Sequence, residues 1–269
     1  MNIRGKVFVV TGGGNGIGRA LVLELLSRGA RVAAVDMSQL GLSNTVEIAG
    51  GQAEFLSAHI VDITEKAAVY SLPDSVMAAH GTVDGVINCA GIIQGFEKFE
   101  KTGIEEIQRV VNTNLYGTVF MIKAFFPHLK CRPEACIMNI SSMGGLFPVL
   151  GQTVYGFSKA AVKLLTEGLY QELQGTNIHV SVVFPGGVNS NIMKNSGVAV
   201  NKKLEKLQGM IKITMPGKAA RVIIDGIERN RSRIFVGMDV KAMNLLYKLS
   251  PQGAPRIISS ILRRLFPEY

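Results

Sequence analysis

The residues of this chain best suited to chemistry are Tyr155 and Lys159, four positions apart, with Ser142 thirteen residues before the tyrosine. On a helix, this spacing places the phenol and the ammonium on one face. A nearby cation favours the phenolate, so we expect Lys159 to lower the pKa of Tyr155 from about 10 toward neutral pH. Such a phenol can take a proton from an alcohol or give one to a ketone. The pair alone is a weak signal, because any helix can carry a surface tyrosine beside a solvated lysine.

A glycine-rich turn near the N-terminus, Thr11 to Gly18 (TGGGNGIG), could hold a phosphate. It follows an apolar strand pattern and precedes a helical one, so its backbone can approach a pyrophosphate that the helix N-terminus then stabilises. Asp36 follows Gly18 by eighteen residues and ends the second strand pattern. A carboxylate there accepts the ribose hydroxyls of NAD and repels the 2′-phosphate of NADP. Asn15 and Met37 add no positive charge, and we therefore predict NAD as the cofactor.

The elements that must position these residues are apolar strands alternating with helices. The strand patterns cover residues 6–10, 31–36, 85–88, 136–140 and 179–184, and the clearest helical patterns cover 19–26, 103–127 and 156–174. Continuous apolar strands of this kind indicate a parallel sheet covered on both faces. We predict a single-domain α/β protein with a Rossmann-type, doubly wound parallel sheet, whose ligands bind at the carboxyl ends of the strands.

The composition agrees with one globular domain. The 269 residues are 47% hydrophobic and 18% charged, with no repeat or linker. We expect a catalytic domain over 1–240, including a substrate lid at about 190–216, and a tail over 241–269. Three cysteines without close pairing and four scattered histidines (59, 80, 128 and 179) predict neither disulfides nor a metal site. With no signal-like or membrane-spanning segment, a cytoplasmic protein is expected.

The chain resembles the short-chain dehydrogenase/reductase family, in the branch with TGxxxGxG and YxxxK motifs. The resemblance runs from about Lys6 to about Gly237 and includes seven motifs in the family's order. These are Thr11 to Gly18, Asp62-Ile63, Asn88 to Gly91, Asn112 to Leu115, Ser141-Ser142, Tyr155 to Lys159, and Pro185-Gly186. Cys89 departs from the family's usual asparagine, and Ser190 stands for its usual threonine.

The resemblance implies roles for individual residues. The catalytic set would be Asn114, Ser142, Tyr155 and Lys159, with Asn114 holding a water in a proton relay. The cofactor would be bound by Gly12, Gly14, Asn15, Gly16, Ile17, Gly18, Asp36, Asp62, Ile63, Asn88, Ala90, Gly91, Tyr155, Lys159, Pro185, Gly186, Val188 and Ser190. The substrate would meet Ser142, Tyr155 and Met193.

These roles imply an NAD-dependent oxidoreductase that interconverts a secondary alcohol and a ketone, and that is a homo-oligomer. The apolar lid residues and residues 147–149 suggest a lipophilic substrate, such as a steroid, prostanoid, retinoid or fatty chain, although core packing explains part of this pattern. The alternatives are an NADPH-dependent carbonyl or ketoacyl reductase, a non-catalytic dinucleotide sensor, and a lipid-surface protein.

The net charge of +9 lacks the aromatic and basic pattern of a nucleic-acid site, so no nucleic-acid partner is expected. The basic residues become denser toward the C-terminus, where residues 255–266 form a basic amphipathic helical pattern. Such a helix can lie on an anionic membrane surface as a peripheral contact, or it can pack against protein. The pattern leaves both alternatives open.

Overall fold

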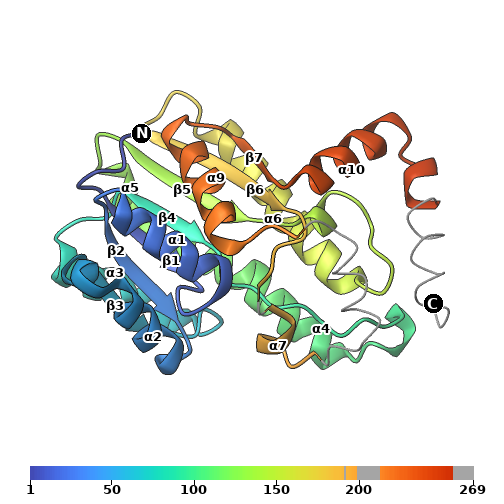
Figure 1. The fold of residues 1–269 in the computed structure, drawn as a ribbon, viewed down its shortest axis with the longest axis horizontal. Coiled ribbons are helices and arrows are strands. Elements are labelled where there is room, and N and C mark those ends of the chain that lie inside the picture. The colour runs from blue at the N-terminus through green and yellow to red at the C-terminus, as the bar shows by residue number, and fades with distance from the viewer. Residues whose placement is uncertain (191, 199–212, 257–269) are drawn as a thin grey trace.

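A computed structural model of the chain describes residues 1–190, 192–198 and 213–256, and it contains a seven-stranded parallel sheet (Figure 1). The strand order is β3-β2-β1-β4-β5-β6-β7. The strands are β1 (Val7–Thr11), β2 (Arg31–Asp36), β3 (Leu56–Ile60), β4 (Gly85–Asn88), β5 (Ala135–Ile140), β6 (Ile178–Pro185) and β7 (Arg233–Val236). The predicted single-domain, doubly wound α/β fold is confirmed.

Helices cover both faces of this sheet. They are α1 (Gly16–Ser27), α2 (Gln39–Ala49), α3 (Lys66–His80), α4 (Ile104–Val111), α5 (Gly117–Lys130), α6 (Thr153–Glu172), α7 (Ile192–Asn195), α9 (Pro216–Glu228) and α10 (Met238–Leu249). Two apolar clusters divide the core, one joining the sheet to α1, α2 and α9, the other joining it to α3, α5 and α6. Figure 1 shows α1 and α9 lying side by side over the first face.

The alternation of side chains along each strand explains the two layers. On β1, Phe8 and Val10 enter the first cluster, whereas Val9 enters the second. All five residues of β1 are buried, as expected for a strand covered on both faces. This arrangement fixes the carboxyl ends of β1, β2 and β4 at one edge of the sheet.

The helix that the sequence predicts over 103–127 is interrupted. α4 ends at Val111, a π-helical turn (η3) covers Asn112–Tyr116, and α5 begins at Gly117. A π turn inserts an extra residue into the helical ladder and often marks a functional position. Here it contains Asn114, which is fully buried.

The C-terminal part of the described chain returns to the sheet. The expected domain boundary at residue 240 falls inside α10, where Val240 packs against Val182 and Phe184 of β6. The basic pattern over 255–266 lies almost wholly outside the described residues. Among those that are described, no helix is both long and apolar enough to cross a membrane.

Candidate active site

A cavity of about 1120 Å³ opens at the carboxyl ends of the strands, where the chain leaving β1 and the chain leaving β4 turn to opposite faces of the sheet. Ligands of doubly wound sheets bind at such a switch point. The expected site residues that line it are Gly12, Gly14, Asn15, Gly16, Ile17, Gly18, Asp36, Asp62, Ile63, Ala90, Gly91, Ser142, Tyr155, Lys159, Pro185, Gly186, Val188, Ser190 and Met193. Asn88 and Asn114 are not among the lining residues.

The glycine-rich turn between β1 and α1 has a backbone that only glycine fits. Gly12 and Gly16 have φ of +72° and +54°, in the left-handed region. A Cβ on Gly18 would lie 2.0 Å from the Gly12 carbonyl oxygen. Asn15 caps α1, its Oδ1 accepting from the Gly16 N–H at 2.7 Å. The start of α1 is therefore held open toward the cavity, as pyrophosphate binding requires.

Asp36 lies at the end of β2 with its carboxylate beside this turn. Oδ2 accepts from the Gly14 N–H and Oδ1 from the Ser38 N–H, both at 2.9 Å. These bonds fix the carboxylate at the rim of the cavity, where an adenosine ribose bound by the turn would lie. The exposed Met37 beside it carries no charge.

The turn after β4 is held by Thr11, which was not among the residues predicted for the site. Its Oγ1 accepts from the N–H groups of Cys89 and Ala90, at 3.0 and 3.1 Å. The first position of the TGxxxGxG motif was the signal that could have identified it. Burial raises the pKa of the Cys89 thiol to about 12, so this cysteine stays protonated at neutral pH.

Asn88, expected to support the adenosine ribose and to steady the sheet, makes contacts of the second kind. Its Nδ2 donates to Asn139 Oδ1 at 2.8 Å, and Asn139 in turn donates to Thr166 Oγ1. These side chains lie buried between β4, β5 and α6 rather than in the cavity. Asn88 therefore joins neighbouring elements beneath the cavity and does not line it.

Asp62 and Ile63 lie after β3, at the end of the cavity away from Tyr155. Asp62 Oδ1 accepts from both the N–H and the hydroxyl of Thr64, at 2.9 and 2.8 Å. Ile63 packs so closely against Gly117 of α5 that a Cβ there would lie 2.6 Å from its Cδ1. Both residues form a wall of the cavity, as a site for an adenine ring requires.

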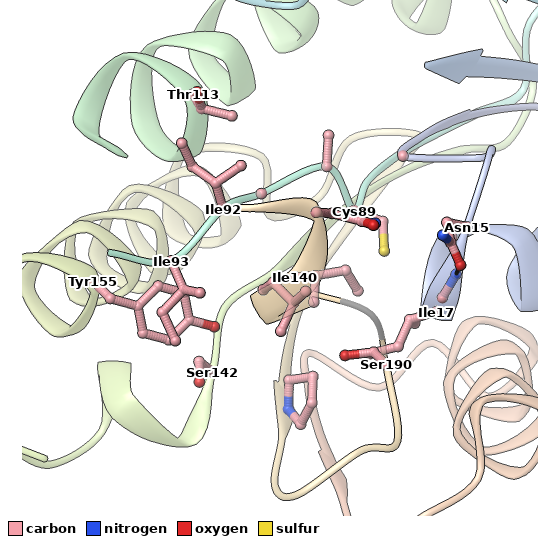
Figure 2. Close-up of a pocket in the computed structure, with 18 of the residues that line it drawn as sticks. Asn15, Ile17, Cys89, Ile92, Ile93, Thr113, Ile140, Ser142, Tyr155 and Ser190 are labelled. Carbon is pink, nitrogen blue, oxygen red and sulfur yellow. Dashed lines mark hydrogen bonds between the residues drawn. The ribbon is translucent and has the colours of Figure 1, made fainter. Parts of the chain in front are cut away.

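Ser142, Tyr155 and Lys159 come together from the loop after β5 and the first turns of α6. Figure 2 shows the Tyr155 hydroxyl close to Ser142 at one end of the cavity, with Asn15, Ile17 and Ser190 at the other. The proximity of the Ser142 hydroxyl acts to lower the pKa of the phenol. Lys159 is 4% exposed, and its Nζ donates to the Ile140 carbonyl oxygen at 3.0 Å.

The expected fall in the Tyr155 pKa is not present in the chain itself. Burial raises the pKa of the phenol, although the ring keeps some access to the cavity, and the Ser142 hydroxyl opposes this rise only in part. Burial also lowers the pKa of Lys159 to about 8. The prediction of a lowered Tyr155 pKa was therefore wrong, because spacing shows the charge of Lys159 but not the desolvation of both groups.

Asn114 lies beside Lys159 but uses its amide for structure. Its Nδ2 donates to the Ile92 carbonyl and to Ser158 Oγ, and its Oδ1 accepts from the Ile92 N–H at 2.9 Å. A Cβ on Gly91 would lie 3.0 Å from both Asn114 Oδ1 and Lys159 Nζ, so these two groups face the same small space.

The loop after β6 closes the cavity from the other side. The Gly187 N–H donates to Asp239 Oδ2 of α10 at 2.7 Å, and the Gly187 carbonyl accepts from the Thr214 N–H. Ser190 reaches the glycine turn, where a Cβ on Gly16 would lie 3.5 Å from the Ser190 Cβ. Asp239 was not predicted, since no motif of the chain points to it.

The end of the cavity beyond Tyr155 has an apolar lining. Its residues include Ile93, Phe96, Met143, Val149, Leu150, Ile192 and Met193. Of the residues expected here, Val149, Ile192 and Met193 line the cavity, whereas Pro148 and Val198 do not. Phe147 packs on the Tyr247 ring, and Met215 is exposed. The remaining lid residues of the apolar pattern, from 199 to 211, lie outside the described part of the chain.

Comparisons with known proteins agree with this site. A family model described as short chain dehydrogenase matches residues 6–201. "Putative oxidoreductase SadH" of Mycobacterium tuberculosis is 33% identical over 99% of this chain and 98% of its own length. "Ketoacyl reductase HetN" of a Nostoc species is 30% identical over 95% of this chain and 88% of its own.

Solved structures show the same fold at 24% identity. A short-chain dehydrogenase/reductase from Burkholderia phymatum in complex with NAD has a TM-score of 0.85, with 94% of this chain and 96% of the other covered. One from Burkholderia cenocepacia in complex with NADP has a TM-score of 0.80, with coverage of 96% and 99%.

The chain belongs to the short-chain dehydrogenase/reductase family. It is therefore an NAD(P)-dependent oxidoreductase, and the cavity fits a nicotinamide dinucleotide. The glycine turn, Asp36 and residues of the segment from Pro185 to Ser190 all line this cavity, as such a cofactor requires.

Proposed function

We propose that this protein uses NAD to interconvert a secondary alcohol and a ketone on a lipophilic substrate. The observation that carries the proposal is the position of Ser142, Tyr155 and Lys159 where the dinucleotide cavity meets its apolar end. A neutral carbonyl or carbinol can reach the Tyr155 hydroxyl from this end. The end beyond Tyr155 is lined mainly by apolar side chains, and the described charged residues that line the cavity as a whole are Asp36, Asp62, Arg109 and Lys159.

In this mechanism Ser142 binds the substrate oxygen and stabilises its developing charge, while Tyr155 moves the proton. The bound cofactor supplies the hydride transfer at its nicotinamide ring. Lys159, buried against the Ile140 carbonyl, is placed to hold the ribose hydroxyls and to favour the phenolate. Asn114 Oδ1 and Lys159 Nζ face the same small space beside Gly91, which supports the expected place of Asn114 in a proton relay.

The preference for NAD rests on Asp36. Its carboxylate is fixed by two backbone N–H groups, so it cannot easily turn away from a 2′-phosphate. The main alternative is an NADPH-dependent ketoacyl reductase, which the likeness to a protein named ketoacyl reductase favours. The position of Asp36 supports NAD, because the 2′-phosphate of NADP would lie beside this carboxylate. Placing two like charges together costs several kcal/mol.

We also propose a homo-oligomer. Phe157 and Leu164 lie seven residues apart on one face of α6, and they are 43% and 68% exposed. The half-exposed Tyr116, at the neighbouring π turn, adds a further apolar side chain. A face of this kind is more often covered in an assembly than left in water.

The function is tested by Tyr155→Phe, assayed against a panel of apolar secondary alcohols and ketones with NAD and NADP. Because the variant lacks the proton-transferring group, we expect turnover to fall by about 10²- to 10⁴-fold while the affinity for NAD stays close to that of the wild type. Tyr170→Phe on the exposed side of α6 is the matched control and should leave turnover unchanged. Turnover retained in Tyr155→Phe would remove this residue from the mechanism.

A further inference from the structure

A short segment beside the cavity, Ile92 to Gln94, is bound by three separate elements, and we name it the strap. Ile92 is held through both backbone groups by the Asn114 side chain of the π turn. The Ile93 N–H donates to Ser196 Oγ at 3.0 Å, just beyond α7. Gln94 reaches the third element, α6. The strap thus joins three parts of the molecule that are far apart in the sequence.

Gln94 makes the contact nearest to the chemistry. Its side chain is 1% exposed, and its Oε1 accepts from the backbone N–H of Tyr155 at 2.9 Å. Its carbonyl oxygen accepts from Gln152 Nε2 at 3.3 Å. Both contacts reach the start of α6, about sixty residues further along the chain.

The backbone N–H groups at the start of α6 need a hydrogen-bond acceptor from outside the helix. The first N–H groups of a helix have no acceptor within the helix, and a Ser, Thr, Asn or Asp at the N-cap normally supplies one to the third residue. Here the N-cap is Gln152, which makes no such bond, and the third residue is Tyr155. Gln94 supplies the missing acceptor from another segment of the chain.

We propose that Gln94 is a positioning residue for Tyr155. By accepting from the Tyr155 N–H, it fixes the first turn of α6 and hence the direction of the phenol toward Ser142. The bond between the adjacent Ile93 and Ser196 ties the end of α7, next to the cavity-lining Met193, to the same strap. This inference rests on the proposed function for its catalytic consequence, but its structural part stands on the hydrogen bonds alone.

The test replaces Gln94 with methionine, which keeps the length of the side chain and removes the acceptor. We expect kcat to fall by about 10- to 100-fold, because a displacement of roughly 1 Å in a reacting group can cost that much. The affinity for NAD, measured by fluorescence titration, should stay near that of the wild type. Amide hydrogen exchange in residues 153–158 should become faster, because the first turn of α6 loses its fixed partner.

Two further variants distinguish a loss of Tyr155 positioning from a general destabilisation of the fold. Gln94→Glu keeps an oxygen acceptor and should restore most of kcat, and its added negative charge near the phenol should move the pH profile to higher pH. Gln52→Met, which removes one side-chain bond to the Leu26 carbonyl far from the site, is the matched control and should change neither kcat nor the exchange of 153–158. If Gln94→Met does not fold, Gln94→Asn, whose acceptor is one methylene shorter, replaces it.

The proposal is overturned if Gln94→Met keeps kcat within about twofold of the wild type, or if Gln52→Met causes an equal loss. It is also overturned if exchange in 153–158 is unchanged, or if Gln94→Glu does not restore activity. Failure of the proposed function has a different signature. In that case the wild type turns over nothing on the substrate panel, while the exchange measurement still reports whether Gln94 holds the first turn of α6.

Discussion

At the residue scale, Lys159 combines a functional position with an unfavourable environment. Its ammonium is buried and donates to the backbone carbonyl of Ile140, and burial holds its pKa at about 8 instead of 10.5. Because the unfolded chain keeps its proton between pH 8 and 10.5 while the folded chain loses it, the contribution of this group to stability rises with pH across that window. Below pH 8, the buried charge destabilises the fold.

We therefore predict that Lys159→Met abolishes turnover and stabilises the protein at pH 7 by an amount on the order of 1 to 3 kcal/mol. Urea unfolding at several pH values measures this, and the difference from the wild type should shrink as the pH rises from 8 to 10.5. Lys163→Met is the matched control on α6. It breaks the ion pair with Glu167 and should slightly destabilise the protein. A lower stability of Lys159→Met at pH 7 would contradict the prediction.

At the same scale, we propose that the carboxylate of Asp36 determines the preference for NAD over NADP. We predict that Asp36→Asn, which removes the charge and keeps an oxygen acceptor, lowers the ratio of kcat/KM for NAD over NADP by about 10- to 100-fold, since a like-charge contact costs several kcal/mol. Steady-state kinetics with both cofactors measures the ratio. Asp62→Asn, at the adenine end, is the charge-matched control. An unchanged ratio in Asp36→Asn would leave the NAD preference without this basis.

Most of the site residues that the sequence predicts line the cavity, because the glycines, Asp36 and the Tyr–Lys pair stand in recognisable spacing. It did not identify Thr11, Gln94 or Asp239, since each acts on a backbone group that lies far away in the sequence. Such hydrogen bonds depend on how helices and strands pack together, which the spacing of nearby residues in the sequence does not show. The same limit explains the error in the Tyr155 pKa, which burial controls.

At the element scale, five of the seven strands were predictable because each is an apolar run between turns, whereas β3 and β7 were not among the predicted strand patterns. The predicted helix over 103–127 was continuous in pattern, yet the π turn at Asn112–Tyr116 divides it. The hydrogen bonds of Asn114 to Ile92 and Ser158 hold this turn in place. Their partners come from other elements, so periodicity alone could not reveal the interruption.

The junction of α3 and β3 gives the fold a pH dependence. His80, 7% exposed at the end of α3, contacts Ser57 Oγ through Nε2 at 2.8 Å, and Ser57 Oγ also contacts His59. Burial, together with the charge of Arg31, lowers the pKa of His80 to about 4. The unfolded chain binds a proton near pH 6.5 and the folded chain only near pH 4, so stability falls as the pH drops through this window.

We predict that the free energy of unfolding falls by about 2 to 3 kcal/mol between pH 6.5 and 4 because of this group. In His80→Gln, which can keep a bond to Ser57 without titrating, that part of the loss should disappear. Urea unfolding of both proteins over this pH range provides the comparison. Parallel curves for the two proteins would show that His80 does not titrate as described.

At the scale of the whole molecule, several arginines are paired with acidic side chains. Arg28 lies among Glu24, Asp225 and Glu228, Arg132 pairs with Asp84, and Arg233 pairs with Glu167. The net charge of +9 already counts these acids, so the pairing does not lower it, but it reduces the local positive charge around these three arginines. The basic residues Arg263 and Arg264 belong to the C-terminal tail, outside the described residues.

We predict that the full chain co-floats with vesicles containing phosphatidylserine, and that a chain ending at Arg256 does not, because residues 257–269 carry the basic apolar pattern. The cut spares Ala254, which is fully buried. Charge reversal of Arg263 and Arg264 to glutamate is the control for electrostatic attraction. If the full chain stays with the soluble fraction, the tail packs against protein instead.

The bond from Gly187 to Asp239 limits how far this enzyme can be shortened. Residues 6–201 contain every recognised motif, yet the carboxylate that fixes the loop over the nicotinamide position comes from α10. A trimmed version or a chimaera that exchanges everything after β7 would thus alter the cofactor loop without touching any motif residue. In this chain, α10 begins well beyond the residues that the family model matches, yet it helps to fix the loop after β6.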